Sequence, residues 1–227
     1  MARGVGAVDI IQTTLPDWVA LVAALVTQLG DAWFLTLLLI SLVVTQRERR
    51  EGILAVGGML AVAIGLYRTL KHIFERPRPN EEWFDPGLLP DVLEPLYEGA
   101  AYATGYGFPS GHATSVTVAY LGLAVVLTVG TRRQRFGVAG VVVALVSASR
   151  VALGVHYLVD VVAGVALGAV VLAVGLQECG PRLSLSQIFG MGIAASLCYL
   201  VASGGRIESV LLLCLTAGLF VGWRYRG

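Results

Sequence analysis

The chain has 227 residues, of which 56% are hydrophobic and 14% are charged, and its formal net charge is +1. An ordinary soluble domain carries about 25% charged residues, so this composition excludes a water-soluble globular protein and predicts a membrane protein. The near-neutral balance, without a basic stripe, indicates no nucleic-acid partner.

The apolar runs predict an all-α, polytopic transmembrane bundle of about seven spans, with six as the alternative. A helix needs about 20 apolar residues to cross the hydrocarbon core. The candidate spans in chain order are residues 18–45, 52–73, 112–130, 136–153, 157–177, 187–204 and 207–223. The last two form either two spans or one re-entrant pair. We expect a single domain over residues 1–227, with a core at 18–177 and additional C-terminal spans at 187–223.

Arginines gather at alternate connections, which predicts the sidedness of the bundle. They follow the first, third, fifth and seventh spans, at Arg47, Arg49, Arg50, Arg132, Arg133, Arg135, Arg182, Arg224 and Arg226. Positively charged loops stay in the cytoplasm. We therefore expect a cell-membrane protein with a cytoplasmic C-terminus, while the N-terminus and the loop at 75–111 face outward.

The outer loop at 75–111 is the longest connection, and it is acidic. Its carboxylates are Glu75, Glu81, Glu82, Asp85, Asp91, Glu94 and Glu98. Long loops in compact folds are usually functional or disordered. The loop is either a solvated acidic cap with interfacial aromatic anchors or a gate over a site.

Three polar clusters interrupt the apolar pattern, and span parity places all of them at the outer membrane surface. The first is Lys71 with Arg78-Pro79 after the second span. The second is the segment 109–112, Pro-Ser-Gly-His, at the start of the third. The third begins with Ser149-Arg150 and ends with His156 and Asp160, around the turn between the fourth and fifth spans. Ionisable residues near a bilayer are costly and usually functional.

The cations of these clusters predict a site for a multiply charged anion. Arg78 and Arg150 can each fork onto phosphate oxygens, while Lys71, the only lysine in the chain, supplies a point charge. Ser110 adds a hydroxyl donor. Gly111 lets its backbone N–H approach at a helix start, where the dipole favours an anion. Hydrogen-bond donors from the three clusters would approach from three directions, which matches the three equatorial oxygens of a phosphoryl group in transfer.

The two histidines of the clusters have different neighbours and are assigned different roles. His156 and Asp160 lie four residues apart on one helix face, so the carboxylate can hold one ring nitrogen while the other attacks phosphorus. His112, from another helix, can protonate the leaving oxygen and then activate water. We expect no metal and no other cofactor, because the cations supply the charge.

Four further polar residues are given no part in this chemistry. His72 belongs to no spacing that suggests catalysis. Arg68 and Arg76 are interpreted as loop or headgroup contacts, and Asp31 as an interfacial or packing carboxylate.

These clusters resemble the three-part signature of the type-2 phosphatidic acid phosphatase superfamily, over roughly residues 18–177. The resemblance implies a helical bundle with its site at the membrane surface. It implies a nucleophile at His156 backed by Asp160, an acid at His112, and phosphate ligands at Lys71, Arg78, Ser110, Gly111 and Arg150. Many members have six spans, so the pair after residue 187 departs from the pattern. Soluble haloperoxidases and acid phosphatases share the signature, but the spans here argue against them.

The predicted function is therefore a metal-independent membrane phosphatase that acts through a phosphohistidine on a lipid partner. An outward site favours a polyprenyl diphosphate, then phosphatidate-like lipids, then a soluble phosphoester. The alternative is a transporter or anion-binding membrane protein that uses the same cationic rim. Few polar residues lie deep in the spans, which disfavours transport.

Overall fold

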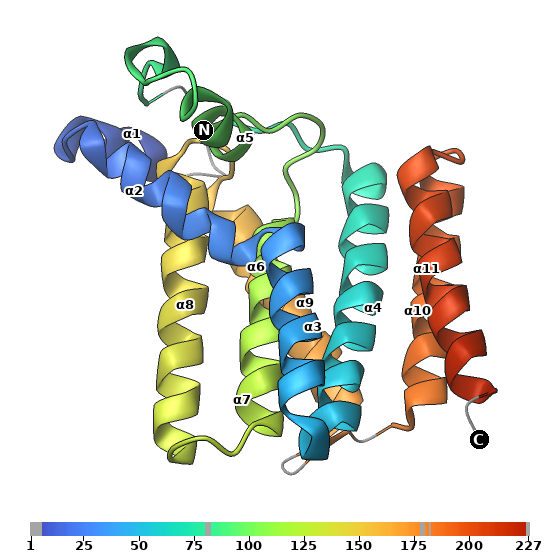
Figure 1. Cartoon of the computed structure of the whole chain (residues 1–227). Helices are drawn as coiled ribbons and strands as arrows, with labels where there is room; N and C mark the ends of the chain where they lie inside the picture. Colours follow the sequence, from blue (N-terminus) through green and yellow to red (C-terminus); the bar gives the residue numbers. More distant parts are fainter. Residues whose placement is uncertain (1–5, 80–82, 178–179, 182, 226–227) are drawn as a thin grey trace.

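The computed structural model describes residues 6–79, 83–177, 180–181 and 183–225. Four charged residues named above lie outside these ranges: Glu81, Glu82, Arg182 and Arg226. Figure 1 shows an upright helical bundle. Its elements are α1 (Ala7–Thr14), α2 (Trp18–Thr27), η1 (Gln28–Gly30), α3 (Ala32–Thr45), η2 (Arg47–Arg49), α4 (Arg50–Phe74), η3 (Pro86–Leu88), α5 (Glu94–Ala101), α6 (Gly111–Val116), η4 (Thr117–Leu121), α7 (Gly122–Val126), α8 (Arg132–Ala152), α9 (Leu158–Gly175), β1 (Leu176–Gln177), β2 (Gly180–Pro181), α10 (Leu185–Ala202) and α11 (Ile207–Arg224).

The prediction of an all-α, multi-pass bundle is confirmed. Five segments are long and apolar enough to cross a membrane: Arg47–Phe74, Arg132–Ala152, Leu158–Gly175, Leu185–Ala202 and Ile207–Arg224. The pair Trp18–Gly30 and Ala32–Thr45 adds a sixth if it counts as one span, and Gly111–Val126 is a shorter apolar helix. In the described part of the chain, the strands are limited to β1 and β2, an antiparallel pair after α9. The C-terminal segment forms two separate 18-residue helices, α10 and α11.

The first predicted span is not one continuous helix, because it bends by 48° between α2 and α3. The chain turns at Gly30 and Asp31, where Asp31 has an extended backbone (φ −75°, ψ 149°). A Cβ on Gly30 would lie 2.8 Å from Val116 Cγ1 and 2.9 Å from Val146 Cγ1. The glycine therefore lets this turn press against α6 and α8, and α2 runs inclined across the end of the bundle (Figure 1).

Close helix crossings fix the bundle, and they rely on glycine. A Cβ on Gly164 of α9 would lie 2.6 Å from Ser110 O, and one on Gly168 would lie 2.7 Å from Thr117 Cβ. Small residues four apart allow this approach between membrane helices. The crossing also lets Ser110 N donate to Asp160 O over 2.8 Å, which joins the second cluster to the third.

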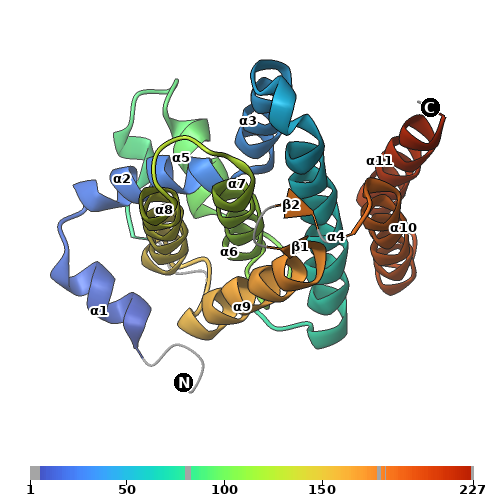
Figure 2. The same ribbon diagram turned by 90° about the horizontal axis from the view of Figure 1, so that it is seen from below.

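The C-terminal hairpin packs on α4 through two other glycines. A Cβ on Gly58 would lie 2.7 Å from Ile188 Cγ2, and one on Gly65 would lie 2.7 Å from the Ala195 carbonyl carbon. Figure 2 shows α10 beside α4, with α11 outside it. The connection between α10 and α11 therefore returns to the end of the bundle at which α4 ends (Figure 1).

The outer loop is partly a packed element. Its helix α5 contributes Tyr97 and Ala100 to a buried cluster with Ala20, Ala23 and Ala24 of α2. The part of the loop around α5 therefore lies over the end of the bundle and is held to α2 by apolar contacts.

Candidate active site

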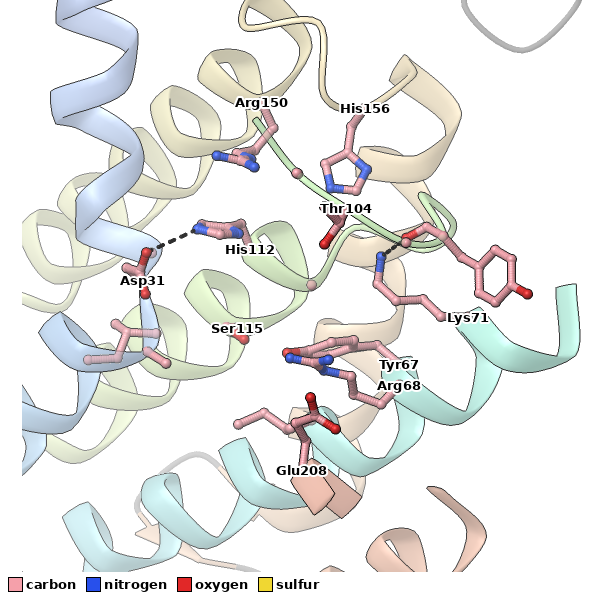
Figure 3. A pocket seen from close by; sticks show the side chains of 18 of the residues that line it. Asp31, Tyr67, Arg68, Lys71, Thr104, His112, Ser115, Arg150, His156 and Glu208 are labelled. Atoms are coloured by element: carbon pink, nitrogen blue, oxygen red, sulfur yellow. Dashed lines mark hydrogen bonds and ion pairs between the residues drawn. The ribbon is translucent and has the colours of Figure 1, made fainter. Parts of the chain in front are cut away.

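A cavity of about 820 Å³ lies where α4 ends and α6 begins (Figure 3). Six of the eight predicted site residues line it: Lys71, Arg78, Gly111, His112, Arg150 and His156. Ser110 and Asp160 lie behind this lining and are fully buried. The fold therefore brings the three clusters together at one place, on one end of the bundle.

His156 lies in the turn before α9, and its two ring nitrogens have different neighbours. Its Nε2 lies 3.0 Å from Nη1 of Arg78, and its Nδ1 lies 3.6 Å from Oδ2 of Asp160. A guanidinium only donates, so we assign Nε2 as the acceptor and place the ring proton on Nδ1, facing the carboxylate. Nε2 then carries the lone pair that can attack phosphorus once Arg78 Nη1 turns from it to a phosphoryl oxygen.

Asp160 is held by the start of α9 and by the segment that leads into α6. Its Oδ2 accepts the Tyr157 N–H over 3.0 Å, as part of the cap of α9. A Cβ on Gly107 would lie 3.2 Å from the same Oδ2 and 3.3 Å from Arg78 Cγ. A side chain at this glycine would therefore crowd the carboxylate and the arginine at once.

The surroundings of His156 favour its neutral form. Burial lowers the pKa of His156 well below its ordinary value of 6.5, and the positive charges of Arg78, Arg150 and Lys71 lower it further. The carbonyl of Gly107 acts in the opposite direction. The imidazole is therefore unprotonated at neutral pH, which is the form a nucleophile requires.

Arg78 is oriented by backbone carbonyls on two sides. Its Nε donates to Gly105 O over 3.2 Å, and its Nη1 donates to Val155 O over 2.8 Å. Within the described residues Nη2 has no hydrogen-bond partner. One edge of the guanidinium thus remains available to a ligand beside His156.

Arg150 is a buried cation, and among the described residues no carboxylate lies within ion-pair distance of it. Its side chain is 3% exposed, and its Nη1 donates to Thr27 Oγ1 over 3.0 Å and to Ala100 O over 2.9 Å. Its buried Nε has no partner among the described residues. An isolated buried charge is costly, so this arrangement favours an anionic ligand in the cavity.

Lys71 points from the end of α4 to the segment before α6. Its Nζ donates to Tyr106 O over 2.6 Å and to Gly107 O over 3.3 Å. The ammonium therefore ties this segment down and adds a third positive charge to the cavity.

Ser110 and Gly111 make structural contacts at the start of α6. The Ser110 Oγ accepts the Ala113 N–H as the cap of α6, and the residue is absent from the cavity lining. A Cβ on Gly111 would lie 2.8 Å from Tyr67 Cε2, so packing against α4 requires this glycine. Phosphate binding by the Ser110 hydroxyl and the Gly111 N–H stays a prediction.

Asp31 faces the second histidine. Its Oδ2 lies 4.0 Å from His112 Nε2. Asp31 occupies the N-cap position of α3, yet its side chain makes no capping hydrogen bond, although aspartate at this position usually does. Gly30 beside it sits close to His112, since a Cβ there would lie 3.3 Å from His112 Cδ2. The bend between α2 and α3 therefore presents a carboxylate to His112 (Figure 3).

Several cavity residues were not assigned to the site from the sequence. They are Asp31, Tyr67, Arg68, Thr104, Ser115, Arg206 and Glu208. Arg68 and Ser115 each lie three residues from a motif residue on the same helix, which was the available signal for them. Tyr67 lies four residues before Lys71 on α4, which is the same kind of signal. Nothing in the spacing of Asp31, Thr104, Arg206 and Glu208 connects them to the motifs, because they come from the bend, the outer loop and the C-terminal hairpin.

Comparison with known proteins agrees with this geometry. Residues 52–178 match the PAP2 superfamily. The chain is 34% identical to decaprenylphosphoryl-5-phosphoribose phosphatase of Mycobacterium tuberculosis over 142 residues, which cover 62% of this chain and 68% of that protein. It is 30% identical to undecaprenyl-diphosphatase of Sulfolobus acidocaldarius over 151 residues, 65% of each chain.

Two solved structures share the fold. The first transmembrane PAP2 type phosphatidylglycerolphosphate phosphatase from Bacillus subtilis aligns with a TM-score of 0.60 at 25% identity, over 74% of this chain and 80% of that one. Aquifex aeolicus LpxE aligns with a TM-score of 0.54 at 24% identity, over 75% of this chain and 93% of that one. With residues 52–178 matched and the three motifs at one cavity, the chain belongs to the PAP2 superfamily and is a multi-pass membrane phosphatase.

Proposed function

We propose that the chain hydrolyses a lipid phosphate or polyprenyl diphosphate through a phosphohistidine on His156, without a metal ion. The observation that carries the proposal is the arrangement of His156. Its Nδ1 faces Asp160 at 3.6 Å, and its Nε2 lies beside Arg78 in a cavity lined by three motif cations. Nucleophilic attack on phosphorus needs a neutral imidazole with one nitrogen facing a carboxylate and the other facing the cavity that would hold the anion.

In the first half-reaction, the phosphoryl group replaces His156 Nε2 as the partner of Arg78 Nη1. Nε2 attacks phosphorus, the phosphorus–oxygen bond to the leaving group breaks, and His112 gives its proton to the departing oxygen. Asp160 stabilises the positive charge that develops on the imidazole of His156. Lys71 and Arg150 hold the remaining phosphoryl oxygens as charge spreads over them.

In the second half-reaction, His112 removes a proton from water, and the water oxygen attacks phosphorus in line with Nε2. The phosphorus–nitrogen bond breaks, inorganic phosphate leaves, and His156 returns to its neutral form. His112 is again protonated and ready for the next substrate, so protons and atoms balance over the cycle.

The cavity supplies its own positive charge, so we expect activity to persist in excess chelator. Lys71, Arg78 and Arg150 line the cavity, and their positive charges disfavour a divalent cation there. The measurement is phosphate release before and after dialysis against EDTA, with Mg²⁺ added back. A strict requirement for the added ion would contradict the metal-free mechanism.

We expect Asp31→Asn to lower kcat by about 10-fold with little change in KM, because Asp31 holds His112 as the acid. Asparagine still caps helices, so α3 should be retained. A substrate with an activated leaving group, such as p-nitrophenyl phosphate, needs less protonation of that group. The rate of its first step should therefore fall less in the variant. An equal loss on both kinds of substrate would indicate a structural role.

We also propose that the site faces outward and that the opposite end of the bundle is cytoplasmic. Positively charged connections stay in the cytoplasm. Seven described arginines lie in the connections or helix termini of that opposite end: Arg47, Arg49, Arg50, Arg132, Arg133, Arg135 and Arg224. An outward site suits a polyprenyl diphosphate carrier first, a phosphatidate-like lipid second and a soluble phosphoester third.

The test of the proposed function is a panel of polyprenyl diphosphates, phosphatidate, phosphatidylglycerophosphate and sugar phosphates assayed with the purified chain in detergent. We expect phosphate release from the lipids with kcat/KM well above that for the sugar phosphates. Turnover of the sugar phosphates alone would contradict a lipid substrate.

A further inference from the structure

Two arginines outside the three motifs line the same cavity, on the side of the C-terminal hairpin. Arg68 precedes Lys71 by three residues on α4, so both side chains share one helix face about 4.5 Å apart along the axis. Arg206 comes from the connection between α10 and α11. Figure 3 shows Arg68 and Glu208 on one side of the space, and Arg150 and His156 on the other. Relative to the motif cations, Arg68 therefore lies deeper, toward the middle of the bundle.

Arg68 is held in place by aromatic rings. Its guanidinium carbon lies 5.9 Å from the ring centroids of Tyr67 and of Tyr199, the latter on α10. The ion pairs of the described residues join His112 to Asp31 and His156 to Asp160, and Arg68 takes part in neither. The guanidinium also hydrogen-bonds with the side chains of Tyr67 and Tyr199, which are neutral partners. Because an arginine fork binds phosphate oxygens more strongly than neutral hydroxyls, an anion in the cavity can replace these contacts.

A second, smaller cavity continues from this point along the hairpin. It has a volume of about 220 Å³ and is lined by Ile64, Arg68, Tyr199, Glu208, Leu211, Leu212 and Leu215. Ile64, Arg68 and Glu208 line both cavities, so the two adjoin at Arg68. The leucines belong to α11, and Leu211 and Leu215 are more than half exposed toward the outside of the bundle. The result is an apolar groove that begins at a cation and ends at the lipid-facing surface.

We propose that Arg68, with Arg206 at the rim, binds a second phosphate of the substrate, and that the groove on α11 holds the start of its apolar chain. This proposal rests on the proposed phosphatase function. The chemical class is a lipid whose chain is joined to the hydrolysed phosphoryl group through another phosphate, as in a polyprenyl diphosphate. The site uses residues of α10 and α11, which lie outside the family match at 52–178.

The order of chemical groups along such a lipid matches the order of side chains in the protein. The chain enters from the bilayer along the leucines, the inner phosphate reaches Arg68, and the terminal phosphoryl group reaches Lys71, Arg78 and His156. A lipid with one phosphate would leave Arg68 without its ligand. Glu208 beside Arg68 partly offsets the positive charge there, so its removal should strengthen the subsite.

The test compares farnesyl diphosphate with farnesyl monophosphate on the purified full-length chain in detergent. For Arg68→Gln we expect kcat/KM for the diphosphate to fall about 10- to 100-fold, with less than about a 3-fold change for the monophosphate. Glu208→Gln should raise kcat/KM for the diphosphate by about 2- to 5-fold. Equal losses on both lipids, or no loss with Arg68→Gln, would overturn the second-phosphate site.

Arg76→Gln is the matched control, because it removes one positive charge from the same end of the bundle at a residue outside the cavity lining. We expect it to leave the ratio of the two kcat/KM values unchanged. An equal change of that ratio with Arg76→Gln would show that overall charge, and not a subsite at Arg68, sets the preference.

The groove is tested by filling it. Leu215→Trp should raise KM for farnesyl diphosphate several-fold and leave KM for the five-carbon isopentenyl diphosphate unchanged. Leu219→Trp, one turn further along α11 and outside the groove, should change neither. An equal effect of Leu215→Trp on both chain lengths would exclude the groove as the chain site.

The proposed function and the subsite fail in different ways. If the wild-type chain releases no phosphate from either farnesyl lipid, the phosphatase proposal fails for this lipid class. The second-phosphate site is then tested by measuring the affinities of the chain for a farnesyl methylenebisphosphonate and a farnesyl phosphonate, neither of which can be hydrolysed. A wild-type preference for the bisphosphonate that Arg68→Gln removes would support the subsite, and equal affinities would overturn it.

Discussion

Replacing His156 with alanine should lower kcat by at least about 10⁴-fold, because the mutation removes the atom that forms the bond to phosphorus. The oxyanion contacts of Arg78 and Arg150 remain in this variant, so substrate should still bind. The measurement is initial phosphate release from the best lipid of the panel, together with retention of label from a substrate carrying ³²P in its terminal phosphate. Wild-type protein should retain acid-labile label, and the variant should retain none.

His72→Ala is the matched control for this experiment. His72 follows Lys71 on α4 and lines the same cavity, where it contacts the rings of Tyr106 and Tyr199, with centroids 5.8 Å away in both cases. We expect its loss to change kcat by less than about 3-fold, because these contacts are to aromatic rings and not to the reacting atoms. Label retained by His156→Ala at the wild-type level would show that another residue is the nucleophile.

Replacing Arg78 should have the second-largest effect, and two substitutions separate its fork from its charge. Arg78→Lys keeps the charge but loses contacts to Gly105 O, Val155 O and the phosphoryl oxygens, so we expect kcat/KM to fall by about 10²-fold. Arg78→Gln loses the charge as well and should cost about 10³-fold. Rate constants unchanged by the lysine variant would contradict the role of the fork.

The pH dependence of the same variants tests the electrostatics of His156. The nucleophile must be neutral, so kcat/KM falls as the pH drops through the pKa of His156, which burial and the nearby cations hold well below 6.5. The acid limb of wild-type protein should therefore lie below pH 6.5. Arg78→Gln removes one of the charges that lower this pKa, so its limb should move to higher pH, while Arg78→Lys should move it less. An unshifted limb in Arg78→Gln would exclude this charge effect.

The extra residues of the cavity show how the site extends beyond its motifs. Asp31 comes from the bend of the first predicted span, and Arg206 comes from the C-terminal hairpin. Both lie outside residues 52–178. The matched segment thus contributes the proposed chemistry, and we propose that the segments around it adjust the acid and select the lipid.

The sequence by itself determined the class of the protein and the three clusters, whereas its count of about seven spans exceeds the five, or six with the bent pair, that are long enough to cross. The length of an apolar segment is a local property of the sequence, and it decides whether the segment can cross a bilayer. The motif residues lie close enough in sequence to be positioned within one helix turn or one connection. Span parity then placed all clusters at one end, because each helix crosses the bundle once.

Only the tertiary structure decided how the remaining side chains join these clusters. The kink at Gly30 depends on contacts with Val116 and Val146 of other helices. At this kink the Asp31 carboxylate faces His112 and does not cap α3. Arg68 is interpreted from the sequence as a loop or headgroup contact, but in the structure it lines the cavity beside Tyr199 of α10. Such contacts join residues far apart in the chain through the packing of whole helices, and no local pattern of residue types encodes that packing.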